Sequence, residues 1–166
     1  MQEIEKKFLI KSLPGDLNQY QKIHVVQGYL SASGRPSLRV RKYGDEYILS
    51  YKFKERTQKE VANVAREVEL PLVEESFEHL MKKVDGRIVE KNRYLIPLEN
   101  DLTAELDVFE GYLDGLKFVE VEFQSEEDAA NFNPPEWFGK DVTFDVHFKN
   151  GYLSRIADVA EILELM

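Results

Sequence analysis

Charged side chains stand at every second position near the start of the chain, at Glu3, Glu5 and Lys7. Successive side chains of a strand point to opposite faces, so a strand over residues 1–10 places these three charges on one face. Two carboxylates about 7 Å apart along a strand can share a hard divalent cation through their oxygen atoms. A lysine two residues further on adds a positive charge, so that a phosphate group can bridge the metal and the ammonium. The alternative, more common for an isolated Glu-x-Glu, is a strand whose charges face water.

The same spacing recurs along the chain. Basic pairs with this spacing occur at Arg39/Arg41, Lys52/Lys54 and Lys91/Arg93, and acidic pairs occur in four apolar-interleaved segments: Glu3/Glu5, Glu67/Glu69, Glu105/Asp107 and Glu120/Glu122. With 31 acidic residues among 166, random order gives roughly six acidic pairs at this spacing, which is also the number found. The number of pairs is therefore uninformative, whereas their position in strand-like segments indicates a shared purpose.

Hydrophobic periodicity predicts an α+β protein with about eight strands. The strands are expected over residues 1–10, 22–30, 37–43, 46–54, 65–72, 87–96, 102–109 and 117–123. Helices are expected over residues 73–84, in a short segment capped by Ser125, and over residues 152–165 at the C-terminus. Hairpin-length connections such as Gly44-Asp45 favour antiparallel pairing. We therefore predict an eight-stranded antiparallel β-barrel flanked by helices.

Two arrangements of such a barrel fit the charge pattern. In the first, which is the more frequent in general, the apolar faces fill the interior and the charges lie outside in water. In the second, the charges line the interior and the helices cover an apolar outer wall. Alternating acids and bases pair well in a confined space, and three amphipathic helices need an apolar surface to cover. An eight-stranded barrel encloses room for side chains or one small ligand.

The composition excludes several classes of protein and site. A chain of 166 residues is expected to form one domain over residues 1–166, and the lack of cysteine excludes disulfides and thiolate metal sites. No Gly-x-x-x-x-Gly-Lys motif is present, which excludes a P-loop. The net charge of −9 argues against a nucleic-acid-coating surface, and no apolar run approaches transmembrane length. Without a signal-peptide pattern, we expect a cytoplasmic protein without a nucleic-acid or membrane partner.

The ordered set of motifs resembles the CYTH superfamily, the triphosphate tunnel metalloenzymes, and in particular its small bacterial members. The segment Glu3-Ile-Glu-Lys-Lys7 is similar to the Glu-x-Glu-x-Lys signature of that family, and the resemblance continues in order to about residue 154. The other segments that carry it are Leu38-Arg-Val-Arg41, Ile48-Leu-Ser-Tyr-Lys52, Arg66-Glu-Val-Glu69, Glu90-Lys-Asn-Arg93, Glu105-Leu-Asp-Val-Phe109, Gly115-Leu116, Glu120-Val-Glu-Phe123 and Trp137-Phe-Gly-Lys-Asp-Val-Thr143.

The resemblance implies a tunnel in which bases bind a triphosphate and carboxylates bind Mg²⁺ or Mn²⁺. The implied metal ligands are Glu3, Glu5 and Glu122, with Glu120 as a fourth candidate. The implied phosphate-binding residues are Lys7, Arg39, Arg41, Lys52, Lys54, Lys91 and Arg93. Lys7, Glu67, Glu69 and Asp107 are the implied catalytic residues, and Glu105 is a weaker candidate.

The expected activity is metal-dependent hydrolysis of a terminal phosphoanhydride bond in inorganic triphosphate or a small organic triphosphate. A metal lowers the pKa of its bound water, so His24, His79 and His147 are expected to be structural or on the surface. Two alternatives stay open: a class IV-type adenylate cyclase acting on ATP, and a non-catalytic binder of polyphosphate or nucleotide. The cyclase needs an adenine pocket and a base for the ribose 3′-hydroxyl, and neither is apparent in the sequence. A homodimer is compatible with these expectations.

Overall fold

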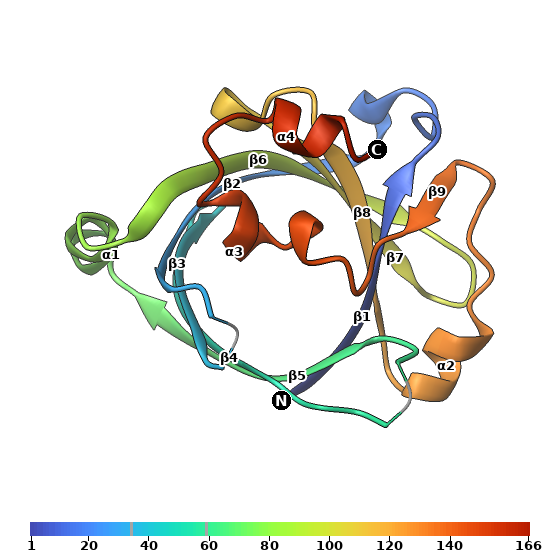
Figure 1. Ribbon diagram of the computed structural model, residues 1–166, viewed down its shortest axis with the longest axis horizontal. Helices are drawn as coiled ribbons and strands as arrows, with labels where there is room; N and C mark the ends of the chain where they lie inside the picture. The colour runs from blue at the N-terminus through green and yellow to red at the C-terminus, as the bar shows by residue number, and fades with distance from the viewer. Residues whose placement is uncertain (34, 59) are drawn as a thin grey trace.

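One antiparallel sheet of nine strands forms a barrel in the computed structural model, which describes residues 1–33, 35–58 and 60–166 (Figure 1). The strand order is β5-β4-β3-β2-β6-β7-β8-β1-β9, and pairing of β1 with β5 closes the barrel. The strands are β1 (Gln2–Ile10), β2 (Gln21–Ser31), β3 (Ser37–Tyr43), β4 (Glu46–Lys54), β5 (Asn63–Leu72), β6 (Asp85–Pro97), β7 (Thr103–Phe109), β8 (Lys117–Phe123) and β9 (Phe138–Asp141). The predicted eight-stranded barrel is confirmed, and the short strand β9, beside β1, is an addition.

Short helices and 3₁₀ turns flank the barrel. They are η1 (Leu17–Gln19), α1 (Glu74–Met81), η2 (Gly111–Leu113), α2 (Glu126–Asn131), η3 (Val146–Phe148), α3 (Asn150–Leu153) and α4 (Ala160–Leu163). The central helix predicted over residues 73–84 is confirmed as α1. The predicted cap of α2 is also confirmed, because the Ser125 hydroxyl accepts a hydrogen bond from the Asp128 amide at 3.0 Å. Within the described residues, no helix is long and apolar enough to cross a membrane.

The outer wall of the barrel is apolar and covered. Ile4, Leu106, Val119 and Val121 are buried in one cluster with side chains of α2 and β9. Val40 lies on the outward face of β3, and its side chain is fully buried. The second of the two expected arrangements is therefore correct: the strands turn their apolar faces outward and their charged faces inward.

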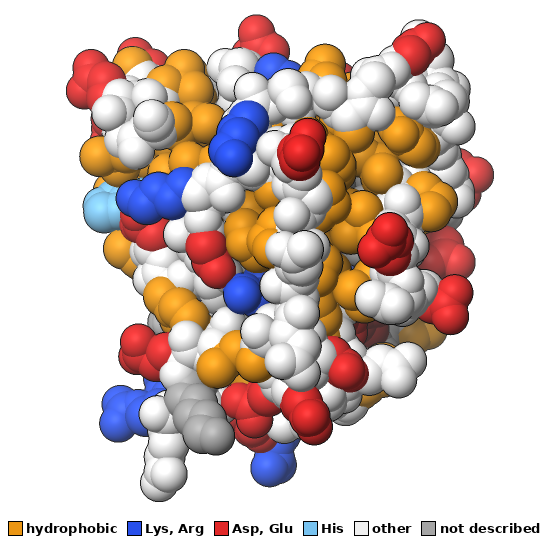
Figure 2. Space-filling model, turned by 90° about the vertical axis from the view of Figure 1, so that its right-hand side faces the viewer, with side chains coloured by type: hydrophobic (Ala, Val, Ile, Leu, Met, Phe, Trp, Pro, Cys, Tyr) orange, Lys and Arg blue, Asp and Glu red, His pale blue; other side chains and the backbone are white. Residues whose placement is uncertain are grey.

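The cover of the outer wall is partly open to solvent. On the face that carries α2 and β9, hydrophobic side chains are visible between charged ones (Figure 2). Partly buried hydrophobic residues pack here against the outer cluster, among them Leu17, Tyr20, Leu102, Phe132 and Trp137. Loops as well as helices thus cover the apolar wall, so a few short helices are enough to complete the cover.

One end of the barrel interior is apolar instead of charged. Inward-facing Leu9, Phe109 and Phe118 pack there with Phe148 and Leu153 of the C-terminal segment. The Phe118 ring lies 5.0 Å from that of Phe109 and 5.9 Å from that of Phe148. In Figure 1 the segment that contains η3 and α3 lies within the outline of the barrel. We call this cluster the apolar cap; it holds the C-terminal segment across this end of the barrel.

The prediction of a single C-terminal helix over residues 152–165 is wrong. Helix α3 ends at Leu153 and α4 begins only at Ala160. The carbonyl groups between them bond to β6 instead of continuing a helix: the Arg87 amide donates to Ser154 O at 2.7 Å and Arg87 Nη1 donates to Ala157 O at 3.0 Å. Packing against the barrel therefore overrides the helical periodicity. The assignment of the whole chain to one domain stays a prediction.

Substitution of Leu106 by Ala tests the covered outer wall. Leu106 is fully buried, so Leu106→Ala removes apolar contacts and leaves a cavity, and the free energy of unfolding should fall by about 2–5 kcal/mol. Urea denaturation measures this loss. The control is Val68→Ala on β5, where the outward side chain is 50% exposed and the expected change is below about 1 kcal/mol. Equal losses in the two variants would contradict the arrangement.

Candidate active site

A cavity of about 780 Å³ lies inside the barrel, and most of the predicted site residues line it. Every strand from β1 to β8 contributes at least one inward side chain. The predicted residues that line the cavity are Glu3, Glu5, Lys7, Arg39, Arg41, Lys52, Lys54, Glu67, Glu69, Arg93, Glu105, Glu120 and Glu122. Lys91 and Asp107 are not among the lining residues, because both are buried in the wall.

Strand register places acids and bases next to each other in the tunnel. Lys52 on β4 pairs in register with Glu67 on β5, and Lys7 on β1 pairs with Glu120 on β8. Glu5, two residues before Lys7, lies opposite Glu122. The period of two that defines a strand therefore gathers the charged residues on one inner surface, as acid–base neighbours and as the carboxylate pair Glu5 and Glu122.

Most of the tunnel bases are held by carboxylates. Arg41 Nη2 lies 2.6 Å from Glu69 Oε1, and Lys52 Nζ lies 2.7 Å from Glu3 Oε1. Arg39 Nη2 is 3.7 Å from Glu67 Oε1. Burial disfavours the charged form of Lys52, but Glu5 and Glu3 outweigh burial and raise its pKa. These three bases are thus ion-paired with carboxylates that a polyanion can replace.

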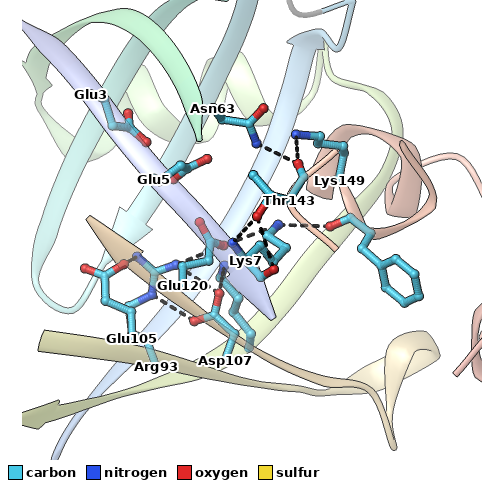
Figure 3. A network of polar contacts seen from close by, with 12 residues as sticks. Glu3, Glu5, Lys7, Asn63, Arg93, Glu105, Asp107, Glu120, Thr143 and Lys149 are labelled. Carbon is cyan, nitrogen blue, oxygen red and sulfur yellow. Dashed lines mark hydrogen bonds and ion pairs between the residues drawn. The ribbon is translucent and has the colours of Figure 1, made fainter. Parts of the chain in front are cut away.

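Asp107 organises two buried cations behind the cavity. It bonds Lys91 Nζ at 2.5 Å and accepts two bonds from the Arg93 guanidinium, at 2.8 and 2.9 Å. Arg93 also reaches Glu105, with Nη1 at 2.6 Å from Oε2 (Figure 3). Burial raises the pKa of Asp107, but Arg93 and Lys91 outweigh it and the pKa lies below its usual value. Burial lowers the pKa of Lys91 to about 8. Asp107 is therefore placed to orient Arg93, which itself lines the cavity.

The four predicted metal ligands do not share one electrostatic environment. Burial raises the pKa of Glu5 to about 8, against the opposing effect of Lys52, and raises that of Glu122 to about 7, with Glu3 and Glu105 adding to the effect. The pKa of Glu120 lies well below its usual range, because Lys7 and Arg93 outweigh its burial. The protonated forms of Glu5 and Glu122 are therefore favoured, whereas Glu120 is paired with cations and stays ionised.

The histidines lie outside the tunnel cavity, as expected. His24 on β2 forms a cluster with Glu90 and Glu110, in which His24 Nε2 lies 2.8 Å from Glu90 Oε1. One possible ligand atom from each of these three side chains lies within 4.8 Å of the other two. His24 and Glu90 are on the outward faces of β2 and β6 and are about 45% exposed. The cluster is therefore separate from the tunnel carboxylates.

A group of polar residues near the apolar cap was not predicted from the sequence. Lys149 Nζ donates to Thr143 O at 2.9 Å, and Asn63 Nδ2 donates to the same oxygen at 2.8 Å (Figure 3). Lys7 Nζ donates to Phe148 O at 2.9 Å. Asn63 is an inward residue of β5, like Glu67 and Glu69. A predicted strand that started at residue 63 instead of 65 would have included it. Lys149 lies in an irregular segment that has no periodic signal.

Comparisons with known proteins agree with this architecture. The family model described as the CYTH domain matches residues 1–141. An inorganic triphosphatase of Nitrosomonas europaea is 40% identical over 156 residues, covering 93% of this chain and 97% of the relative. An inorganic triphosphatase of Acetivibrio thermocellus is 34% identical over 155 residues, covering 91% and 92%.

A solved structure has the same fold along nearly the whole chain. It is the crystal structure of an inorganic triphosphatase, and it superposes with a TM-score of 0.67 at 38% sequence identity. The match covers 94% of this chain and 96% of the other. The charged tunnel, the ordered motifs and these matches lead to one conclusion: the chain belongs to the CYTH family.

Proposed function

We propose that this protein is a metal-dependent triphosphatase that hydrolyses a terminal phosphoanhydride bond of inorganic triphosphate inside its tunnel. The observation that carries the proposal is the cavity itself, where bases from β1, β3, β4 and β6 face a carboxylate cluster on β1 and β8. Both curated relatives bear the name inorganic triphosphatase, in agreement with the predicted activity. We place the protein in the cytoplasm, with a small molecule as its substrate and no nucleic-acid or membrane partner.

The carboxylates on β1 and β8 suit a hard divalent cation. Glu3, Glu5 and Glu122 line the cavity together and offer only oxygen donors, which favours Mg²⁺ or Mn²⁺. Glu120 is the weaker fourth ligand, because two different bases already contact it, Lys7 at 3.4 Å and Arg93 at 3.9 Å. When bound, the cation supplies positive charge to the phosphate oxygens and lowers the pKa of bound water.

The phosphate chain replaces carboxylates as the partner of the tunnel bases. The Arg39 and Arg41 guanidinium groups are suited to bidentate contacts with phosphate oxygens, whereas Lys52 and Lys7 act as point charges. Arg93 binds the same chain from β6, held in orientation by Asp107. Lys91 supports that orientation from within the wall, so Lys91 and Asp107 are positioning residues in this proposal.

Glu67 and Glu69 are the groups placed to orient the attacking water. In the free protein they are partners of Arg39 and Arg41, and a bound triphosphate that draws the arginines away frees both carboxylates to accept a hydrogen bond from water. Attack on the terminal phosphorus expels a diphosphate, and the surrounding cations stabilise the negative charge that shifts onto it. Positioning and electrostatic stabilisation then supply most of the acceleration.

The direct experiment compares two products. Phosphate released from inorganic triphosphate and cyclic AMP formed from ATP are measured side by side, each with Mg²⁺ and with Mn²⁺. Rapid phosphate release supports the proposal. Formation of cyclic AMP without triphosphate hydrolysis, or tight triphosphate binding without turnover, would refute it in favour of one of the two alternatives.

Neutralising a proposed metal ligand should abolish most of the activity. Glu5→Gln and Glu122→Gln each remove one negative charge from the donor set, and turnover should fall at least about 100-fold. Phosphate release across a Mg²⁺ titration measures the effect. The matched control is Glu99→Gln on an exposed turn, which should retain the wild-type rate. Wild-type rates in both tunnel variants would refute the metal assignment.

The raised pKa values of Glu5 and Glu122 predict a pH-dependent stability of the metal-free protein. A carboxyl group with a raised pKa binds its proton more tightly in the folded state, so its stabilising effect is full below pH 4.5 and is lost as the pH rises toward about 8 for Glu5 and about 7 for Glu122. Between about pH 5 and 7 the free energy of unfolding should fall by on the order of 1 kcal/mol per pH unit for Glu5, and by less for Glu122, because solvent screens its more exposed carboxyl group.

Calorimetry in a chelating buffer measures this slope. Glu5→Gln should reduce the slope, because the amide cannot titrate. Adding Mg²⁺ to the wild-type protein should raise its melting temperature. This fall with rising pH is expected only up to about pH 7. Above it, the lowered pKa values of Lys149 and Lys91, about 7 and about 8, make the free energy of unfolding rise with pH. An identical slope in wild type and variant would show that Glu5 does not titrate in this range.

Removal of the buried charge of Asp107 should destabilise the fold. Asp107→Asn leaves Lys91 and Arg93 as buried cations without their shared partner, and the free energy of unfolding should fall by about 3–5 kcal/mol. The KM for triphosphate should rise as well, because the Arg93 guanidinium loses its orientation. Urea denaturation and steady-state kinetics measure the two effects, with Asp114→Asn, on an exposed loop, as the control. An unchanged denaturation midpoint would contradict this role for Asp107.

A further inference from the structure

The cover of the outer wall is interrupted over β4 and β5. Tyr51 and Phe53 of β4 are 40% and 37% exposed, and Val68 and Leu70 of β5 are 50% and 54% exposed. Strand register joins them, because Tyr51 lies opposite Val68 and Leu49 lies opposite Leu70. In Figure 1 the two strands lie on the side of the barrel opposite α4. We call these five outward side chains the β4–β5 patch.

The patch is large enough for a small protein interface. Strands β4 and β5 contain 9 and 10 residues, so each is about 30 Å long at about 3.3 Å per residue. With side chains that extend beyond the strands on both sides, the pair presents roughly 450 Å² of mainly apolar surface, a size at which exposed patches are often functional. Two copies packed through this face and its rim bury about 1,000 Å² in total, near the lower limit for a specific interface. The expected association is therefore weak, with a Kd in the micromolar range.

The backbone edge of β5 is less suited to association than its face. Strand β1 pairs with β5 only from Asn63 to Arg66, and the Glu67 amide donates to Met1 O at 2.9 Å. Backbone groups alternate in direction along a strand, so those of Pro71, four residues further on, point to the same edge as those of Glu67. Proline has no N–H to offer to a further strand, and a proline at an edge hinders pairing. The face of the sheet is therefore the surface that can bind a partner.

Charges of opposite sign border the two ends of the β4–β5 patch. At one end the Arg35 guanidinium lies 5.7 Å from the centre of the Phe53 ring. The Arg66 side chain at the same end is 76% exposed, and Glu55 neutralises only one of these two arginines. At the other end, α1 begins with two exposed glutamates, of which Glu74 is the first. The patch thus has a basic end and an acidic end along the direction of β5.

A two-fold axis through the centre of the patch brings the opposite ends together. In a two-fold contact the same surface is used on both copies, so an axis between Val68 and Leu70 sets the two β5 strands antiparallel. The Arg66 end of one copy then faces the partner's Glu74 end, and this contact occurs twice. Sheets that pack face to face lie about 10 Å apart, which leaves room for interdigitated side chains such as Tyr51. The patch is therefore complementary to itself in both shape and charge.

We propose that the β4–β5 patch is a homodimer interface, in which two copies of this chain pack face to face with the Arg66 end of each against the partner's Glu74 end. The apolar side chains supply the affinity, and the charges at the two ends fix the orientation. The interface is independent of the proposed activity, because the same two strands turn Lys52 and Glu67 to the opposite side, into the tunnel. Each copy keeps its own complete tunnel.

Sedimentation velocity measures the association over protein concentrations from about 1 to 200 µM, which bracket the expected Kd. The wild-type protein should shift with concentration from the 19.4 kDa chain to twice that mass. Leu70→Glu places a charge at the centre of the patch and should weaken the association at least about tenfold. The matched control is Ile88→Glu on β6, where the wild-type side chain is 43% exposed, and this variant should associate as the wild type does.

Melting temperatures at low concentration verify that each variant is folded, and the phosphate-release rate should be the same in all of them. A wild-type protein that is a single chain over the whole concentration range would overturn the interface. So would a dimer that Leu70→Glu leaves intact, because two copies would then meet through another surface.

Charge reversal tests the orientation of the two copies. Arg66→Glu and Glu74→Arg should each weaken the association by about threefold or more, because each brings like charges together at both ends of the interface. The double variant restores opposite charges and should recover most of the wild-type affinity. A double variant that associates more weakly than either single variant would overturn the antiparallel arrangement.

Discussion

Charges inside a closed barrel are tolerated only when they have partners, and this constraint shapes the whole molecule. An unpaired buried charge costs several kcal/mol, and pairing offsets that cost only where hydrogen bonds are well formed. The tunnel follows this rule in most of its circumference: Arg41 lies against Glu69, Lys52 against Glu3, and Arg93 against Asp107. The rule is relaxed around Glu122, which lies near other carboxylates, and around Lys149, which lies near Lys7 and Lys54.

The same constraint also requires an apolar outer wall. Because strand side chains alternate, an ionic interior forces Ile4, Leu106 and Val121 to face outward, where they need a cover. Short helices, β9 and loops supply it, and the cap formed by Phe118 and Phe148 protects one end of the interior from water. Site and fold are thus specified by one alternating pattern.

The sequence predicted the barrel, its antiparallel pairing and most of the tunnel residues, because strand alternation is a strictly local property. It also identified the family. Features that depend on tertiary contacts were not predicted. Lys149 lies in an irregular segment and was not named, whereas Lys91 and Asp107 were named but are buried and do not line the cavity. The expected C-terminal helix failed for the same reason, since Arg87 takes the carbonyl groups that a helix would have used.

Closure through β1 has a consequence for the folding of the chain. The first strand pairs with β5 and with β8, and Lys7 and Glu120, which are partners in that pairing, are separated by more than a hundred residues. Contacts of such long sequence separation carry a large loop-closure entropy and slow the search for the native state. The N-terminal strand, although made first by the ribosome, must wait for the eighth strand before its second edge is paired. Until then its apolar face stays uncovered, and apolar surface that is exposed during folding favours aggregation.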